Sequence, residues 1–191
     1  MKLFLTSILL MILSSCGVQH HFTNSREAAS DTSYIYDLPY KKGTSRFLVQ
    51  GYDSWFSHRG RKGLDFKMKK NSPVYAARGG VVVSVQEGFK KGGSSRRYYG
   101  KGNHVIIRHA DGTQALYGHL AYNGALVNVG DTVQQGQEIA RSGSTGYSAL
   151  PHLHFVVWRS APAGKRDQLP TRFRTEKGVK YLRRGRWYKA I

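Results

Sequence analysis

The sequence contains one cysteine in 191 residues, Cys16. A chain with a single thiol cannot form a disulfide within itself, so the fold must be stable without one. A structural zinc site of the usual cysteine-rich kind is excluded as well, because such sites use several thiolates. Any metal site in this chain must therefore be built from imidazoles and carboxylates.

Acidic residues are scarce: 11 Asp and Glu stand against 30 Lys and Arg, for a formal charge of +19. Such an excess predicts anionic partners. Nucleic acid would be the first expectation for a cytoplasmic chain. The N-terminus predicts export, so we expect cell-wall polymer, acidic lipid head groups or lipopolysaccharide, and no nucleic acid. The alternative is a basic surface that serves only solubility.

The apolar run at the N-terminus, from Leu3 to Leu13, is about half of the ~20 residues that a membrane-spanning helix needs. Following Lys2, it predicts a signal peptide over residues 1–15. A signal peptide of the ordinary kind would leave Cys16 as a free cysteine beside the cleavage site.

The segment Leu13-Ser14-Ser15-Cys16 resembles the bacterial lipobox, which implies that Cys16 becomes the lipidated first residue of the mature chain. Acyl chains would attach the protein to a membrane without spanning it. We therefore expect a cell-envelope protein, anchored outside the cytoplasm at the outer membrane and facing the periplasm.

No segment shows the sustained 3.6-residue apolar stripe of an amphipathic helix, so helices should be few and short. Apolar residues instead alternate with period two, which predicts strands. Asp111-Gly112, between two such runs, is a strong hairpin signal. We predict a mostly β fold, a single antiparallel sheet domain with a groove. The alternating runs are Val74–Val85, His104–His109, Gln114–Leu120, Gln137–Arg141 and His154–Trp158.

Composition divides the rest of the chain. Residues 16–33 are polar and predict a flexible tether, and residues 34–164 suit one domain with its own core. Within it, residues 87–102 are rich in glycine and cations and predict a mobile loop. Residues 165–191 are basic but interleave large apolar residues, which predicts a short hairpin packed on the domain.

Two histidines, in His152-Leu153-His154, lie on the same face of a predicted strand, because side chains alternate along a strand. Alone, such a pair is weak evidence for a metal site. His58, Asp65 and His119 provide further imidazoles and a carboxylate in similar settings. Three protein ligands with an open fourth position are typical of catalytic zinc.

Several motifs together resemble the lysostaphin-type (LytM-like, M23) zinc endopeptidases of bacterial cell wall. The resemblance implies a zinc-dependent endopeptidase of peptidoglycan with one Zn²⁺ per chain. The bond it is expected to cut is the D-alanyl-diaminopimelate bond of the stem peptides, with glycine bridges as the alternative. It implies that His58, Asp65 and His154 bind the metal and that His119 and His152 are catalytic. The motifs are Ser72-Pro73-Val74-Tyr75-Ala76-Ala77, Tyr117-Gly118-His119-Leu120, Val129-Gly130-Asp131 and Gly143-Ser144-Thr145-Gly146-Tyr147 before Pro151-His152-Leu153-His154-Phe155.

The spacing between His58 and Asp65 departs from this family, because the two residues lie seven positions apart rather than at the shorter usual interval. If the longer loop broke the site, the protein would be a non-catalytic wall-binding regulator of other hydrolases. A further alternative is a lipoprotein that binds polyanions through residues 165–191. Tyr52 is a candidate oxyanion donor by resemblance, although a core or rim tyrosine fits equally well.

The remaining histidines are assigned no role in the site: His109 is expected at a strand end, and His20 and His21 in the tether. The run from Val127 to Ile139 also resembles the fold of biotinyl and lipoyl carrier domains. Carriers need a lysine at an exposed hairpin tip, and none lies between Leu120 and Phe155. That likeness therefore concerns only the fold.

Overall fold

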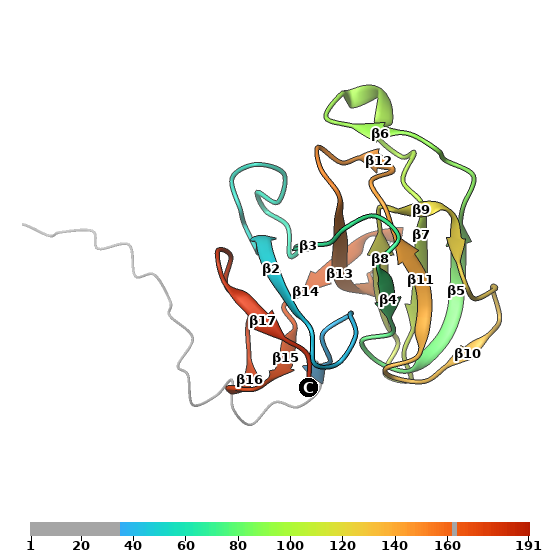
Figure 1. Cartoon of the computed structure of the whole chain (residues 1–191). Helices are drawn as coiled ribbons and strands as arrows, with labels where there is room; N and C mark the ends of the chain where they lie inside the picture. The colour runs from blue at the N-terminus through green and yellow to red at the C-terminus, as the bar shows by residue number, and fades with distance from the viewer. Residues whose placement is uncertain (1–34, 162–163) are drawn as a thin grey trace, which may run out of the picture. The chain divides into compact units, whose positions relative to one another are not determined.

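The computed structural model describes residues 35–161 and 164–191, and these form a mostly β domain (Figure 1). Cys16, His20, His21 and the predicted signal peptide lie outside the described residues. Within the described residues, no helix could cross a lipid bilayer. The one helical element there is a short 3-10 helix, η1 (Arg96–Tyr98), as the missing 3.6-residue stripe predicts.

The largest sheet has nine strands, with the central strand β13 flanked by β8 and β3. Eight of them follow the order β10-β5-β7-β8-β13-β3-β2-β17, and β14 pairs with the far part of β13. Their bounds are β10 (Thr132–Val133), β5 (Gly80–Gln86), β7 (His104–Arg108), β8 (Thr113–Gly118), β13 (His152–Ser160), β3 (Leu64–Lys67), β2 (Ser45–Gln50), β17 (Trp187–Lys189) and β14 (Arg166–Leu169).

Three smaller sheets complete the domain. Most pairings are antiparallel, as expected, but β1–β15 and β6–β12 are parallel. The smaller sheets are β4 (Pro73–Tyr75), β11 (Glu138–Ser142) and β9 (Leu120–Ala125); β1 (Ile35–Tyr36), β15 (Arg172–Thr175) and β16 (Gly178–Lys180); and β6 (Gly92–Gly93) with β12 (Gly146–Tyr147).

The predicted run Val74–Val85 is divided between two sheets, since β4 pairs with β11 whereas β5 pairs with β7. The chain leaves the first sheet at the buried pair Ala76 and Ala77. It enters the second at Gly80, where a side chain would lie 2.2 Å from the carbonyl oxygen of Arg108. Alternation alone did not show this break, because both strands are apolar on alternate positions.

The Asp111-Gly112 hairpin is present and joins β7 to β8. Gly112 has φ +79°, a conformation that glycine adopts without strain. The Asp111 carboxylate accepts a hydrogen bond from the backbone N–H of Thr113 over 3.0 Å. This turn fixes the register of β8, and therefore the position of His119 at its far end.

The segment 87–102 is more ordered than the mobile loop that we expected, since it contains β6 and η1, and β6 pairs with β12. Residues 165–191 contain the hairpin β15–β16. They also contribute β14 and β17 to the largest sheet, so this segment takes part in the main domain.

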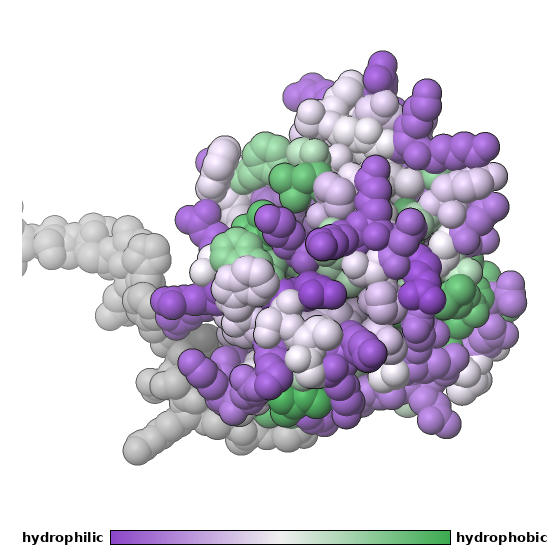
Figure 2. All heavy atoms as spheres, in the orientation of Figure 1, coloured by the Kyte–Doolittle hydropathy of each residue, from purple (hydrophilic) through white to green (hydrophobic). Residues whose placement is uncertain are grey.

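The hydrophobic core lies on one face of the largest sheet, between it and the smaller sheets. Phe155 of β13 is at its centre and packs against Tyr36, Tyr117 and Phe173 with ring centroids 5.3 to 5.9 Å apart. The opposite face of β13 carries the histidines at its start. Outside, hydrophilic side chains predominate around small hydrophobic patches (Figure 2).

Candidate metal centre and groove

Strand register brings Asp65 and His154 together. In the antiparallel pair β3–β13, His154 lies directly opposite Asp65. Residues opposite each other in such a pair point to the same face with Cβ atoms about 4.5–5.5 Å apart. The Nδ1 atom of His154 is accordingly 2.8 Å from Oδ1 of Asp65, although 89 residues separate them in sequence.

His58 reaches the same place from the loop between β2 and β3. Its Nδ1 donates a hydrogen bond to the carbonyl oxygen of Gly51 over 3.1 Å, which leaves Nε2 free of a proton in the neutral ring. That atom lies 3.4 Å from Oδ2 of Asp65. The wide spacing between His58 and Asp65 therefore does not separate them, because the intervening loop folds back.

The residue before β3, Gly63, has to be small for this arrangement. A Cβ atom at this position would lie 2.7 Å from Cε1 of His154 and 3.0 Å from the His58 ring. Contacts this short would displace both imidazoles. Gly63 is a site residue that sequence reasoning missed, and its only signal was its place in the loop before Asp65.

The Asp65 carboxylate is buried and surrounded by polar side chains. Gln50 donates a side-chain N–H to Oδ2 over 2.7 Å, and the Nε2 of His152 lies 3.6 Å from Oδ1. Burial by itself would raise the pKa of Asp65, but the hydrogen bonds with His154 and His58 outweigh it and hold the pKa well below its usual range. Asp65 is therefore an anion at neutral pH. Gln50 was also missed by sequence reasoning.

His119 and His152 lie beside this cluster. Gly118, the last residue of β8, lies opposite His154. His119 is the next residue, so it lies beside the metal cluster. The ring centroid of His119 is 4.6 Å from that of His152 and 5.7 Å from that of His154. The structure thus brings the three predicted metal ligands and the two predicted catalytic histidines into one cluster.

The backbone of His119 is held in an uncommon conformation, with φ +59°. Non-glycine residues rarely adopt positive φ, and such strain is concentrated at functional sites. The ring is fixed by a hydrogen bond of 2.7 Å from Nδ1 to the carbonyl oxygen of Thr145. Burial, together with the neighbouring His152 and His154, lowers the pKa of His119 to about 3, so this imidazole is neutral at pH 7.

His152 has a matching environment. Its Nδ1 donates to the carbonyl oxygen of Leu150 over 2.7 Å, and burial lowers its pKa below the usual value. In both His119 and His152 the neutral ring therefore carries its proton on Nδ1. Each has an unprotonated Nε2, which can accept a hydrogen bond or a proton.

A groove of about 440 Å³ contains the cluster. Tyr99 of the segment 87–102 forms one wall, and Tyr147, Ala149 and Leu150, which precede β13, form a second. There is also a third wall. It comes from the loop after β2, with the exposed Trp55 and Phe56, and from Arg184 near the C-terminus. Figure 1 shows the loop after β2 and the β6–β12 pair at the same end of the main sheet.

Tyr52 does not line this groove. Its hydroxyl is 2.7 Å from that of Thr171 and accepts a hydrogen bond from the Thr171 backbone N–H over 2.8 Å. The side chain packs against the hydrophobic core. Of the two alternatives for Tyr52, this position favours the core tyrosine over the oxyanion donor. His109 is a buried strand-end residue, hydrogen-bonded to the carbonyl oxygen of Gly79.

The donors of His58, Asp65 and His154 fit a zinc ion. One atom from each residue can be chosen so that all three lie within 4.8 Å of one another. Zinc binds imidazole nitrogen and carboxylate oxygen at about 2.0–2.2 Å, which puts neighbouring ligand atoms roughly 3.5 Å apart. The 3.4 Å between His58 and Asp65 matches this, and the 2.8 Å pair needs only a small shift.

Comparison with known proteins agrees with the fold. The sequence model of peptidase family M23 matches residues 59–167, and the chain belongs to this family. The match begins just after His58, so the assignment of His58 rests on the geometry described above. Gln50, Trp55, Phe56 and Arg184 also lie outside the matched residues.

Three relatives show how far the similarity extends. Lysostaphin of Staphylococcus simulans is 44% identical over 95 residues, 49% of this chain and 17% of that protein. The DD-carboxypeptidase/endopeptidase Mpg of Neisseria gonorrhoeae is 35% identical over 121 residues, which are 63% of this chain and 25% of that protein. Glycyl-glycine endopeptidase ALE-1 of Staphylococcus capitis is 36% identical over 151 residues, which are 78% of this chain and 38% of that protein. The chain thus spans well under half the length of these relatives.

Solved structures share the fold. A catalytic-domain variant of the prophage-encoded M23 protein EnpA from Enterococcus faecalis is 26% identical with a TM-score of 0.51, covering 67% of this chain and 92% of that one. A zinc containing peptidase from Vibrio cholerae is 29% identical with a TM-score of 0.50, covering 68% and 37%.

Proposed function

We propose that the protein is a zinc-dependent endopeptidase that hydrolyses peptide cross-links of bacterial peptidoglycan, with the D-alanyl-diaminopimelate bond as its substrate. The observation that carries the proposal is the meeting of His58, Asp65 and His154 at the floor of a groove beside two further imidazoles. Membership of family M23 and similarity to lysostaphin, ALE-1 and Mpg support the peptidase class.

The three residues would hold one zinc ion through two neutral imidazoles and one carboxylate. Zinc bound in this way lowers the pKa of water and polarises a carbonyl group. The carboxylate of Asp65 is kept ionised by its hydrogen bonds and is aligned by Gln50. Asp65 is thus already in the ionised form that metal binding needs.

The two other histidines supply proton transfer. An unprotonated Nε2 on His119 or His152 can take the proton of a water molecule that attacks the carbonyl carbon of the scissile amide. The other imidazole could stabilise the developing oxyanion only with a proton on its Nε2, which would then act as a hydrogen-bond donor. When the C–N bond breaks, the imidazolium returns its proton to the leaving amine. Thr145 and Leu150 keep the two rings in the required tautomer through their carbonyl oxygens.

We further propose that the protein acts in the cell envelope, held at the outer membrane by acyl chains on Cys16. The Leu13-Ser14-Ser15-Cys16 motif and the charge of +19 support this location. A basic protein on a lipid anchor would be drawn to the anionic wall that it cuts.

The test uses the full-length chain purified in detergent with zinc present. We expect about one zinc ion per chain by elemental mass spectrometry, and release of cross-linked muropeptides as monomers by mass analysis. His154→Ala should lose both while its circular dichroism spectrum is kept. His104→Gln is the matched control, because His104 lies on β7 outside the groove. Wall digestion by His154→Ala equal to that of the wild type would remove the ligand assignment.

The same experiment separates the enzyme from a non-catalytic regulator of other hydrolases. A regulator would bind purified wall without releasing muropeptides, even with its zinc site filled. Binding of wall that survives loss of the groove histidines but not high salt would instead indicate a polyanion-binding lipoprotein.

A further inference from the structure

Two arginines, Arg61 and Arg184, line the groove together with the histidine cluster. Both are exposed. In residues 35–161 and 164–191, neither guanidinium has an ion-pair partner, in contrast to the neighbouring Lys62, whose Nζ lies 2.9 Å from Oδ2 of Asp53. A groove with two uncompensated guanidinium groups attracts an anionic ligand.

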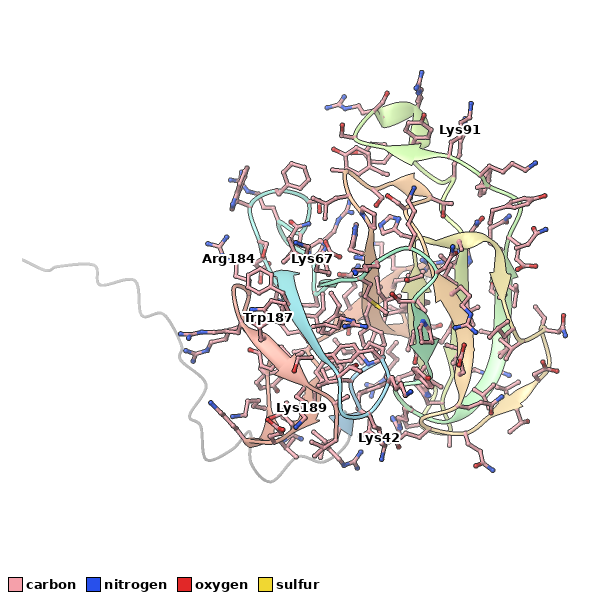
Figure 3. All side chains as sticks on the ribbon, in the orientation of Figure 1. Lys42, Lys67, Lys91, Arg184, Trp187 and Lys189 are labelled. Carbon is pink, nitrogen blue, oxygen red and sulfur yellow. The ribbon has the colours of Figure 1, made fainter. Side chains whose placement is uncertain are left out.

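The backbone holds Arg184 at this wall. Its turn is bound to β2 on both sides, since the N–H of Gly185 donates to the carbonyl oxygen of Leu48 over 2.8 Å and the N–H of Leu48 donates to that of Arg186 over 2.9 Å. A Cβ placed on Gly51 would lie 3.5 Å from the backbone nitrogen of Arg184. Figure 3 shows Arg184 at the end of β2, beside the loop that follows it.

Arg61 is fixed in that same loop. Its N–H donates to the carbonyl oxygen of His58 over 2.8 Å, and its carbonyl oxygen accepts from the N–H of Asp53 over 3.0 Å. The backbone of Arg61 is therefore hydrogen-bonded to that of His58, a residue of the metal cluster. Any peptide whose scissile carbonyl reached that cluster would pass within the range of a long, flexible side chain at this position.

The groove offers these arginines no carboxylate of its own. The one acidic side chain that lines it is Asp65, and Asp65 is buried and engaged by His154, His58 and Gln50. Asp53 is paired with Lys62 outside the lining. The charge balance of the groove wall is thus positive before any substrate arrives.

We propose that Arg61 and Arg184 bind a free carboxylate of the peptide substrate, so that the groove selects stem peptides bearing a carboxylate near the scissile bond over neutral glycine bridges. The inference rests on the proposed peptidase function and names its specificity residues. Guanidinium groups suit this task because they form charge-assisted, often bidentate hydrogen bonds with carboxylates.

Arg61 belongs to the interval between His58 and Asp65. Arg184 lies beyond the residues that the family model matches, 59–167. The carboxylate can belong to a side chain, as in diaminopimelate, or to the end of the stem peptide.

The test compares three synthetic peptides with the same D-alanyl-diaminopimelate bond: one with all carboxylates free, one with the side-chain carboxylate amidated, and one with the C-terminal carboxylate amidated. For the full-length protein in detergent with zinc, we expect at least one amidation to lower kcat/KM by about tenfold or more, the effect of losing one charge-assisted hydrogen bond. The amidation that matters identifies the source of the carboxylate.

Arg61→Gln and Arg184→Gln should each reduce this preference for the free acid severalfold. Arg59→Gln and Arg186→Gln are matched controls, because they remove the same charge from the same loop and turn without touching the groove lining. They should keep the wild-type preference. A preference that falls equally in controls and test variants would indicate general electrostatics and overturn the assignment.

A binding measurement separates this inference from the proposed function. Titration with the three peptides, followed by tryptophan fluorescence, to which Trp55 at the groove contributes, gives a Kd that does not depend on cleavage. If no peptide is cleaved but the free acid binds about tenfold more tightly in an arginine-dependent way, the arginine assignment stands and the peptidase proposal fails. If the peptides are cleaved or bound with equal efficiency, the inference is wrong.

Discussion

The side-chain amide of Gln50 donates a hydrogen bond of 2.7 Å to Oδ2 of Asp65, and a second one of 2.9 Å to the hydroxyl of Ser57. Gln50 is the last residue of β2, paired with Asp65 across the β2–β3 pair after a shift in register. Gln50 therefore holds one oxygen of the carboxylate, Oδ2, while His154 contacts the other, Oδ1.

Replacing Gln50 with alanine should weaken zinc binding by about 10- to 100-fold, as is usual when a partner behind a metal ligand is lost. The reason is that Asp65 would lose the donor that sets its orientation. Competition titration with a chelator of known affinity measures the change. Gln86→Ala, at the exposed end of β5, is the control and should bind zinc like the wild type.

Gly63→Ala should impair the metal centre while leaving most of the fold intact. The added methyl would lie 2.7 Å from the His154 ring and 3.0 Å from that of His58, and overpacking of this kind costs about 1–3 kcal/mol. We expect a lower zinc content and a lower rate of muropeptide release. Wild-type zinc affinity in this variant would show that the two imidazoles can move apart freely.

Substituting His119 or His152 with alanine should separate metal binding from catalysis. Neither is among the three residues of the metal cluster, so each variant should retain about one zinc per chain. Loss of proton transfer should lower kcat by about 10²- to 10⁴-fold. If either variant loses its zinc instead, that histidine is a ligand and the division of roles is wrong.

Asp111 gives a prediction for stability against pH. Partial burial would raise its pKa, but hydrogen bonds with Thr113 and Arg78 outweigh this and lower the pKa to about 2. An unfolded aspartate has a pKa of about 3.9. Because the folded pKa is the lower one, the carboxylate stabilises the fold above about pH 4, and this contribution is lost as the pH falls towards about 2.

The measurement is the unfolding free energy of the wild type and of Asp111→Asn, by denaturant titration at several pH values. The difference between them should be constant from neutral pH down to about pH 4 and should shrink below it. A difference that is unchanged at about pH 2 would show that the hairpin depends on the shape of the side chain rather than on its charge.

One part of the site could be predicted from strand periodicity, because the pattern His152-Leu153-His154 places two imidazoles on one face. The roles of His58, Asp65 and His119 came instead from the resemblance of several motifs to the M23 peptidases. Gln50, Trp55 and Arg184 could not be predicted, since their place depends on which strands pair and on how β17 closes against β2. The two alternatives for Tyr52 could not be separated from sequence, because its distance from His58 along the chain does not show that its hydroxyl turns towards Thr171.

The fold shows the same division. Alternation predicted the strands and the Asp111-Gly112 hairpin, which are local features. It did not predict that Val74 and Val85 belong to different sheets, or that β14 and β17 join the largest sheet from the C-terminal segment. These pairings depend on contacts far apart in sequence, which local patterns do not contain.

The central claim is that His58, Asp65 and His154 share one metal ion. An anomalous difference map, measured at the zinc absorption edge on crystals grown with zinc, tests this most directly. The account predicts a single strong peak within about 2.0–2.2 Å of Nε2 of His58, a carboxylate oxygen of Asp65 and Nδ1 of His154. A peak that excludes Asp65, or no peak in the groove, would contradict it.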